Sequence, residues 1–419
     1  MKIFLSSDIP NHAIVQHTLQ LIALNKKEKF IQVESAEQAD VSIGIAGENT
    51  IQLSLKFFEL LKEKKTQHQL HLNADGIVMI PDSQKTDYLS TIFYYVNCVQ
   101  EYHTSSIDKY GRFNYADSIQ KHLGITHTNF VQQLIDEFCR SIPQLNFLAE
   151  RKRPSKLFLT HDIDYVHKAK NEDGMFALKN KRWLAIFKLL FNHYIGTPDW
   201  LNIDKIISIE KKYGFNSTFF WLTVQDELNS DYNIQSDIIQ KQLKLIQASA
   251  NSIGLHKAIG NTSFELEIKQ LPQPIVANRY HFLKFTVNDF QQMQSAGIQL
   301  DTSLGFAEEI GFRNSYGLPF MPFDLNQNRT LDLIEVSLNL MDRTLFNSGK
   351  SLSEQKETVF NWLNANRFNS IITIDWHNNF FSNLSYNGYE ELYEEILAYA
   401  KENNISCCSP SELIEEFGK

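Results

Sequence analysis

The sequence predicts an α/β protein in which a small α/β domain precedes a distorted (β/α) barrel of seven or eight strands. With 419 residues, the chain is too long for one average domain, and 43% apolar residues provide for a sizeable core. From about residue 155 onwards, short apolar runs alternate with helical patterns, as in proteins built on a parallel sheet. A doubly wound open sheet is the alternative that the same alternation allows.

The polar segment "RKRPSK" (151–156) divides the chain, because Pro154 ends any helix there and its charged neighbours favour solvent. We therefore expect a domain over 1–150 and a barrel over 151–419. The first domain alternates strand and helix patterns but has no glycine-rich phosphate loop and no cluster of metal-ligand residues. We expect it to give support or bind a partner, without chemistry of its own.

The barrel strands are expected in eight apolar or β-branched runs. These are 157–160, 217–223, 252–256, 275–285, 297–301, 333–341, 371–376 and 405–409.

Composition limits which classes of partner the protein can bind and indicates its cellular compartment. A formal net charge of −9 gives no basic face for nucleic acid. No run reaches the roughly 18 apolar residues of a membrane span, and the first 30 residues do not resemble a signal peptide. Four cysteines without CxxC spacing are typical of a reducing compartment. We expect a cytoplasmic protein, and the sequence leaves its oligomeric state open.

Residues capable of chemistry follow most of the expected strands. A single Asp or His in such a place is more often a cap or a packed residue. Several at successive strand ends favour a site, because the carboxyl ends of barrel strands open on one face. The residues concerned are Asp162, Asp164, His256, Arg279, His281, Asp301, Asp342 and His377.

Three of these residues form a plausible ligand set. One carboxylate (Asp164) and two imidazoles (His256 and His281) suit zinc or another divalent first-row metal, with positions left for water and substrate. Asp162 could accept a proton from water, and His377 could protonate a leaving amine. The set predicts metal-assisted hydrolysis of an amide.

The stretch "THDID" (160–164) agrees with this prediction. In an extended chain Asp162 and Asp164 point to the same side, and His161 points to the other. Two neighbouring carboxylates repel each other without a cation, so we expect a metal beside them and no role for His161.

Five segments resemble the polysaccharide deacetylase family, the metal-dependent carbohydrate esterases with a NodB homology domain. The resemblance is greatest to a branch in Bacteroidetes-type bacteria that joins such a barrel to an uncharacterised N-terminal α/β domain. The segments are "LTHDIDYV" (159–166), "GFNSTFFWL" (214–222), "IGLHKA" (253–258), "LDTSLGFAEEIGFRNSYGLPFMPFDL" (300–325) and "TIDWHNNFF" (373–381).

The resemblance implies a role for each matching residue. Asp162 would be the base, Asp164 and His256 metal ligands, Arg313 the residue that orients the base, and His377 the general acid. It also implies a zinc-dependent deacetylase whose substrate is an acetylated sugar or a glycan precursor.

The match departs from the family at one ligand. The usual second motif is His-x-x-x-His, but Gly260 stands four residues after His256, and His281 in "NRYHFLKF" (278–285) is expected to replace the missing ligand. A degenerate barrel that binds a glycan or a partner without catalysis therefore stays an alternative.

Three further residues are expected to contact the sugar: Asp301, Asp342 and the ring of Trp376. Another alternative pairs Asp162 with Asp301 or Asp342 in a metal-free glycosidase.

Overall fold

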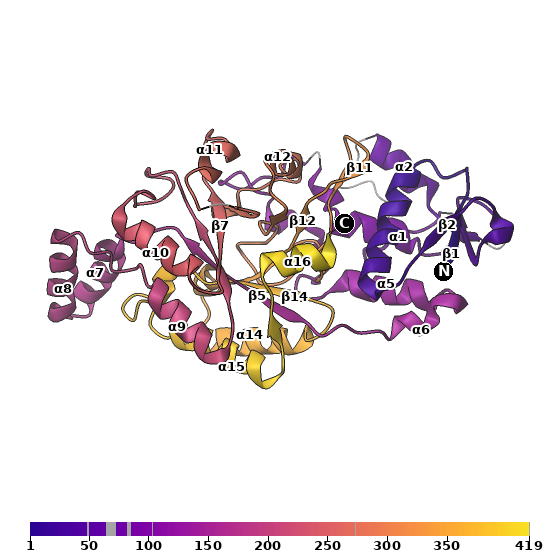
Figure 1. The fold of residues 1–419 in the computed structure, drawn as a ribbon. Coiled ribbons are helices and arrows are strands. Elements are labelled where there is room, and N and C mark those ends of the chain that lie inside the picture. Colours follow the sequence, from indigo (N-terminus) through magenta and orange to yellow (C-terminus); the bar gives the residue numbers. More distant parts are fainter. Residues whose placement is uncertain (48–49, 64–72, 82–84, 103, 273, 419) are drawn as a thin grey trace.

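The computed structural model describes residues 1–47, 50–63, 73–81, 85–102, 104–272 and 274–418, and a curled parallel sheet occupies the larger part of it (Figure 1). The order along the sheet is β12-β9-β8-β7-β6-β5-β14-β13, with β15 beside β5. Its strands are β5 (Lys156–Ile163), β6 (Ser217–Trp221), β7 (Ser252–Lys257), β8 (Ala277–Tyr280), β9 (Leu300–Asp301), β12 (Ile334–Glu335), β13 (Leu338–Met341), β14 (Ile371–Asp375) and β15 (Ser406–Cys407).

The two edges of this sheet lie close together. The edge strands β12 and β13 are separated in sequence by Val336 and Ser337 alone, so the three Cα–Cα steps from Glu335 to Leu338 can span only about 11 Å. Since the strands otherwise follow one another in sequence around the sheet, the arrangement is a distorted (β/α) barrel, and that prediction is confirmed. The expected strand over 333–341 is two strands, because the chain crosses there from one sheet edge to the other.

Helices connect the strands and cover the outside of the sheet (Figure 1). Two of them, α14 and α16, begin with a capping box in which Ser351 pairs with Glu354 and Ser409 with Glu412. The helices are α7 (Ala169–Lys179), α8 (Trp183–Tyr194), α9 (Ile203–Tyr213), α10 (Asp237–Gln247), α11 (Phe264–Ile268), α12 (Phe290–Ser295), α13 (Asp342–Asn347), α14 (Leu352–Ala365), α15 (Tyr389–Glu402) and α16 (Pro410–Phe417). A separate antiparallel pair consists of β10 (Phe323–Asp324) and β11 (Arg329–Thr330).

The N-terminal part forms a second, smaller parallel sheet with the order β2-β1-β3-β4. Its elements are β1 (Lys2–Leu5), α1 (His12–Lys26), β2 (Ile31–Val33), β3 (Val41–Gly44), β4 (Thr50–Gln52), α2 (Leu55–Lys62), α3 (Tyr88–Val96), α4 (Ile119–His122), α5 (Phe130–Arg140) and α6 (Asn146–Ala149). It lies at the end of the molecule opposite to α7 and α8 (Figure 1).

The two parts share one continuous hydrophobic core. Polar contacts also join them: the Val131 amide donates to the Ser315 carbonyl at 2.9 Å, and Asn25 Nδ2 donates to the Tyr316 hydroxyl at 3.2 Å. The boundary near residue 150 falls between the end of α6 and the start of β5, and the division into two domains stays a prediction. Among the described residues, no helix is long and apolar enough to cross a membrane.

Candidate metal centre and active site

Strand β5 delivers two carboxylates to the mouth of the barrel. Its residues are buried almost throughout, and Asp162 near its end is followed by Asp164 just beyond it. His161 points the other way, where its Nδ1 donates to the Trp376 carbonyl at 2.6 Å and its Nε2 lies 2.8 Å from Glu210 Oε1. The expected alternation of these three side chains is therefore present, and His161 serves packing.

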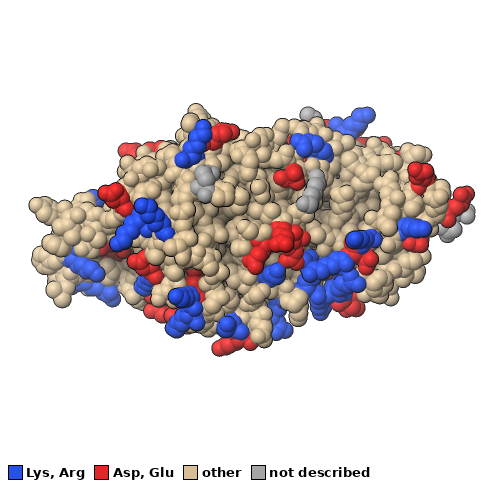
Figure 2. Space-filling model, viewed as in Figure 1, with Lys and Arg blue, Asp and Glu red and all other residues tan. Residues whose placement is uncertain are grey.

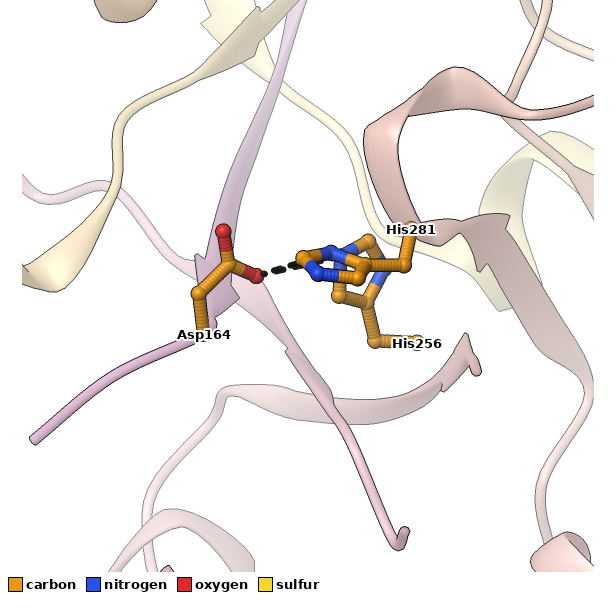
Figure 3. A group of neighbouring side chains, drawn as sticks. All are labelled: Asp164, His256 and His281. Atoms are coloured by element: carbon orange, nitrogen blue, oxygen red, sulfur yellow. Dashed lines mark hydrogen bonds and ion pairs between the residues drawn. The ribbon is translucent and has the colours of Figure 1, made fainter. Parts of the chain in front are cut away.

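Asp164, His256 and His281 converge on a single point (Figure 3). Asp164 Oδ1 lies 3.2 Å from His256 Nε2 and 3.4 Å from His281 Nδ1, and the two nitrogens are 3.1 Å apart. Ligands 2.0–2.1 Å from a tetrahedral zinc ion are about 3.3 Å from one another. The triangle thus has the size that three ligands of one such ion require.

Two further observations fit a cation at this point. Asp164 Oδ1 is buried without a hydrogen-bond donor, although a buried carboxylate oxygen otherwise finds one. The Nδ1 of His256 donates to the Arg279 carbonyl at 2.9 Å, which fixes the tautomer whose Nε2 lone pair faces the triangle. Burial alone would raise the pKa of Asp164, but His281 and His256 more than offset it and hold that pKa well below its ordinary value.

The third residue of the triangle comes from a strained turn. His281 directly follows β8, and the next two residues, Phe282 and Leu283, have φ values of 57° and 53°. Left-handed backbone is unfavourable for side chains of this size, by about 1–3 kcal/mol each. The turn aims the His281 ring at Asp164 and His256, so the strained residues are those that position this ring.

A buried carboxylate, Asp162, lies on one side of the triangle. Asp162 Oδ2 is 3.5 Å from His256 Nε2, and Asp162 Oδ1 accepts a hydrogen bond from Arg279 Nη1 at 2.9 Å. Burial would raise the pKa of Asp162, but Arg279 and the nearby His256 outweigh it and lower that pKa. Asp162 is therefore held as a charged carboxylate.

The imidazole of His377 approaches from the Asp164 side. His377 Nε2 lies 3.7 Å from Asp164 Oδ2, and His377 Nδ1 donates to Asp342 Oδ1 at 2.7 Å. Burial disfavours a charged imidazole, yet Asp342 and Asp375 raise the pKa of His377 well above its ordinary value. Burial and Asp162 raise the pKa of Asp375 to about 7. The neighbouring carboxylates therefore favour the protonated form of His377.

A cavity of about 610 Å³ opens above these residues, and the five residues expected to be ligands, base and acid all line it. Among the other lining residues are Tyr165 and Glu172 after β5, Arg343 and Asn347 on α13, and Lys109, Tyr110 and Arg112 from the N-terminal part. The N-terminal part thus contributes residues of the segment 109–112 to the cavity wall, and its expected role in support or partner binding stays a prediction.

The role expected of Arg313 is wrong. Its guanidinium is buried against Glu101, with Nε 3.0 Å from Oε1 and Nη2 2.6 Å from Oε2, and it does not line the cavity. Arg279 contacts Asp162 instead. Arg279 lies within β8, whereas Arg313 lies in the long segment after β9, and the sequence alone could not show which of the two reaches Asp162.

The three residues expected to contact sugar do not line the cavity either. Asp301 is fully buried, bound by Asn278 at 2.7 Å and by Ser303 at 2.9 Å. Trp376 is fully buried, and Asp342 lies behind His377. The glycosidase alternative loses its second carboxylate, because neither Asp301 nor Asp342 faces the space where Asp162 lies.

Two residues of the site were not assigned a role from the sequence. Arg279 stands two residues before His281, and Asp375 stands two residues before His377, so each shares the alternation that placed Asp162 beside Asp164. The two-residue spacing from His281 and from His377 was the sequence signal that could have placed Arg279 and Asp375 in the site.

Solved structures similar to this chain include a polysaccharide deacetylase, a carbohydrate esterase and a pseudoenzyme. One from Mycobacterium smegmatis is 12% identical, with 64% of this chain and 91% of that chain covered and a TM-score of 0.42. A family 4 carbohydrate esterase from Bacillus anthracis is 12% identical, with coverage of 63% and 84% and a TM-score of 0.31. A pseudoenzyme of that esterase family from the same organism is 9% identical, with coverage of 64% and 68% and a TM-score of 0.35.

The N-terminal part matches a family model over residues 8–147, described as a family of unknown function (DUF7033). A comparison with curated proteins finds no match.

Proposed function

We propose that the protein is a metal-dependent hydrolase that removes N- or O-acetyl groups from a sugar or glycan precursor. The observation that carries the proposal is the triangle of Asp164 Oδ1, His256 Nε2 and His281 Nδ1, with sides of 3.1–3.4 Å, between a charged carboxylate and a charged imidazole. A divalent cation held by these three residues, most simply Zn²⁺, would polarise an acyl oxygen and make water more acidic.

Asp162 and His377 then divide the proton transfers. Asp162, kept ionised by Arg279, accepts a proton from the water that attacks the acyl carbon. His377, held by Asp342, donates a proton to the sugar nitrogen or oxygen as the acyl bond breaks. Water and the acetylated sugar thus give acetate and the free amine or hydroxyl.

The cavity supports a carbohydrate substrate. Its volume of about 610 Å³ lies within the usual range for small-molecule sites, and it combines the aromatic side chains of Tyr110 and Tyr165 with the charged groups of Arg343 and Glu172. We place the reaction in the cytoplasm. The four cysteines, all free thiols, support a reducing compartment.

The test is acetate release by the purified full chain after removal of metal with a chelator and reloading with Zn²⁺, Co²⁺ or Mn²⁺. The substrates are N-acetylglucosamine oligomers and acetylated amino-sugar nucleotides. We expect Asp162→Asn to keep the metal and lose activity by about 10²–10⁴-fold, and His281→Ala to lose the metal. His122→Ala, at an exposed position outside the site, is the control.

A second function is favoured by one observation, namely that Gly260 stands where the related motif has its second histidine. In that case the barrel binds an acetylated glycan without cleaving it. If metal-loaded wild type binds these sugars yet releases no acetate, the result favours the binding protein over the hydrolase. Activity that survives exhaustive chelation would exclude both the metal-dependent hydrolase and the non-catalytic barrel.

A further inference from the structure

Helices α7 and α8 form a hairpin that projects from the barrel at the end opposite to the N-terminal part (Figure 1). Its outer helix is unusually exposed. Tyr194 is 89% exposed, Leu184 87%, Phe187 68%, Phe191 62% and Trp183 57%. Of all the residues of α8, only Leu189 is buried.

The exposed apolar side chains of α8 form one continuous surface. At 100° per residue, Trp183, Leu184, Phe187, Leu190, Phe191, Tyr194 and Ile195 fall within an arc of about 140°. The buried Leu189 lies on the opposite side of the helix, toward α7. The four aromatic side chains alone leave roughly 500 Å² exposed, which is the size of the largest apolar patch on a typical soluble protein, and such patches are often functional. The apolar face of α8 therefore points away from the protein.

Positive charge accompanies this apolar face. Residues 168–195 contain six Lys or Arg (Lys168, Lys170, Lys179, Lys181, Arg182 and Lys188) and two acidic residues. Both acidic side chains turn toward the barrel: Asp173 accepts from Trp200 Nε1 at 2.8 Å, and Glu172 from the Tyr386 hydroxyl. The hairpin thus presents a net positive surface on a chain of net charge −9. Figure 2 shows this end as mainly apolar or neutral, with basic side chains along its lower edge.

The hairpin is attached beside the candidate active site. It leaves the barrel directly after β5 and Asp164, and it returns where the Trp200 amide donates to the Val166 carbonyl at 3.2 Å. Glu172, in the first turn of α7, lines the cavity together with Tyr165. A surface bound by the hairpin would lie next to the mouth of the barrel.

We propose that the α7–α8 hairpin docks the protein on the surface of an anionic lipid bilayer. A helix with Trp, Phe and Leu on one face and Lys or Arg at its borders is the pattern of segments that lie in the membrane interface. With 12 residues, α8 is too short to span the roughly 30 Å hydrocarbon core, so it lies on the bilayer. The basic residues at its border complement an anionic lipid surface, and a bilayer takes up an aromatic-rich face without a preformed groove.

The proposal is tested with the full chain and sedimentation of vesicles made either of phosphatidylcholine alone or with 30% phosphatidylglycerol. We expect binding to the anionic vesicles, and a loss of at least about 100-fold for Phe187→Ser/Phe191→Ser. Lys181→Gln/Arg182→Gln is expected to weaken binding by roughly 30-fold. The matched control, Ile238→Ser/Leu266→Ser, removes two exposed apolar side chains elsewhere and is expected to bind as wild type does.

Trp183 provides a direct reporter, because Trp200, Trp221, Trp362 and Trp376 are all buried. Its fluorescence is expected to shift to the blue on vesicle binding and to be quenched by brominated lipids, and Trp183→Phe should abolish both changes. Failure to bind anionic vesicles would overturn the proposal. So would a dimer that Phe187→Ser/Phe191→Ser dissociates in the absence of any vesicle binding. Because none of these readouts requires acetate release, the result is independent of the proposed function.

Discussion

Arg279 Nη1 lies 2.9 Å from Asp162 Oδ1, and both side chains are buried beneath the candidate metal centre. The same nitrogen lies 3.1 Å from Asp375 Oδ1, so one guanidinium holds two carboxylates that would otherwise repel each other. Arg279 also donates to Thr160 and Thr302, which fixes its position between β5 and β9. Both the charge of the base and the packing of the barrel mouth depend on this side chain.

Replacement of Arg279 by Met is expected to lower the free energy of unfolding by about 3–5 kcal/mol, because it leaves buried charge without a partner. Adding Asp375→Asn should recover part of that loss, since one of the two carboxylates is then neutral. Urea unfolding of the single and double variants measures both effects. Arg329→Met, at an exposed arginine, should change the free energy by no more than about 0.5 kcal/mol. Equal losses in the single and double variants would contradict the bridging role.

Replacement of Asp342 by Asn tests His377 as the proton donor. Without the Asp342 charge the pKa of His377 falls, so less of the imidazole is protonated at neutral pH. We expect kcat for an acetylated amino sugar to fall at least about 100-fold. For an aryl acetate, whose leaving group needs no proton, kcat should change little.

Asp332→Asn, at an exposed aspartate, is the control for this comparison. A loss of equal size for the amide and the aryl ester would mean that Asp342 only maintains the structure.

The ion pair between Glu101 and Arg313 joins the N-terminal part to the barrel. Glu101→Gln is expected to cost about 3–5 kcal/mol of unfolding free energy, because Arg313 then stays buried without its counter-charge. Glu101→Gln/Arg313→Met should be less destabilised than the single variant. The exposed pair of Lys56 and Glu59 is the control, and Glu59→Gln should change stability by less than about 1 kcal/mol. Additive losses from Glu101 and Arg313 would contradict the coupling.

Acid should weaken the junction of the two parts through His17. Its Nδ1 lies 3.0 Å from Thr330 Oγ1, and its Nε2 accepts from Asn97 Nδ2 at 3.3 Å. The Asn97 amide cannot turn over, because its oxygen accepts from the Phe323 amide at 2.9 Å. Burial lowers the pKa of His17 to about 3 from the ordinary value of 6.5, so the folded ring is neutral.

Between pH 6.5 and about 3, His17 is therefore protonated in the unfolded chain and neutral in the folded protein. Its contribution to stability is complete above pH 6.5 and is lost as the pH falls, by about 2 kcal/mol at pH 5. Urea unfolding at pH 7.5 and 5.0 measures this loss, which His17→Gln should remove and the exposed His122→Gln should retain. An unchanged pH dependence in His17→Gln would refute the assignment.

The sequence grouped the three residues of the triangle with Asp162 and His377 because all of them lie at strand ends. In a (β/α) barrel the strand order brings such ends together, so Asp164, His256 and His281 could be grouped from spacing and chemistry alone. Side chains that point into the sheet interior could not be separated from those that face the mouth, and Asp301 was misjudged for that reason. Strands as short as β9 give too few residues for the alternation to show which face each side chain takes.

Contacts between segments that are far apart in the sequence could not be predicted from the sequence pattern. Arg313 was assigned by its place in a motif, but Glu101, more than 200 positions away, determines where its guanidinium lies. The same holds for Tyr110 and Arg112, which line the cavity only because the N-terminal part packs against the barrel.

The hydrogen bond between the Trp200 amide and the Val166 carbonyl has a consequence for how the chain can vary. The 33 residues between them leave and rejoin the barrel at one place, and loop length has only a slow effect on closure entropy. A short turn could replace this whole segment without moving β5. The α7–α8 hairpin is in this sense a detachable module, and chains with the same barrel could gain, lose or exchange it while the position of Asp164 is preserved.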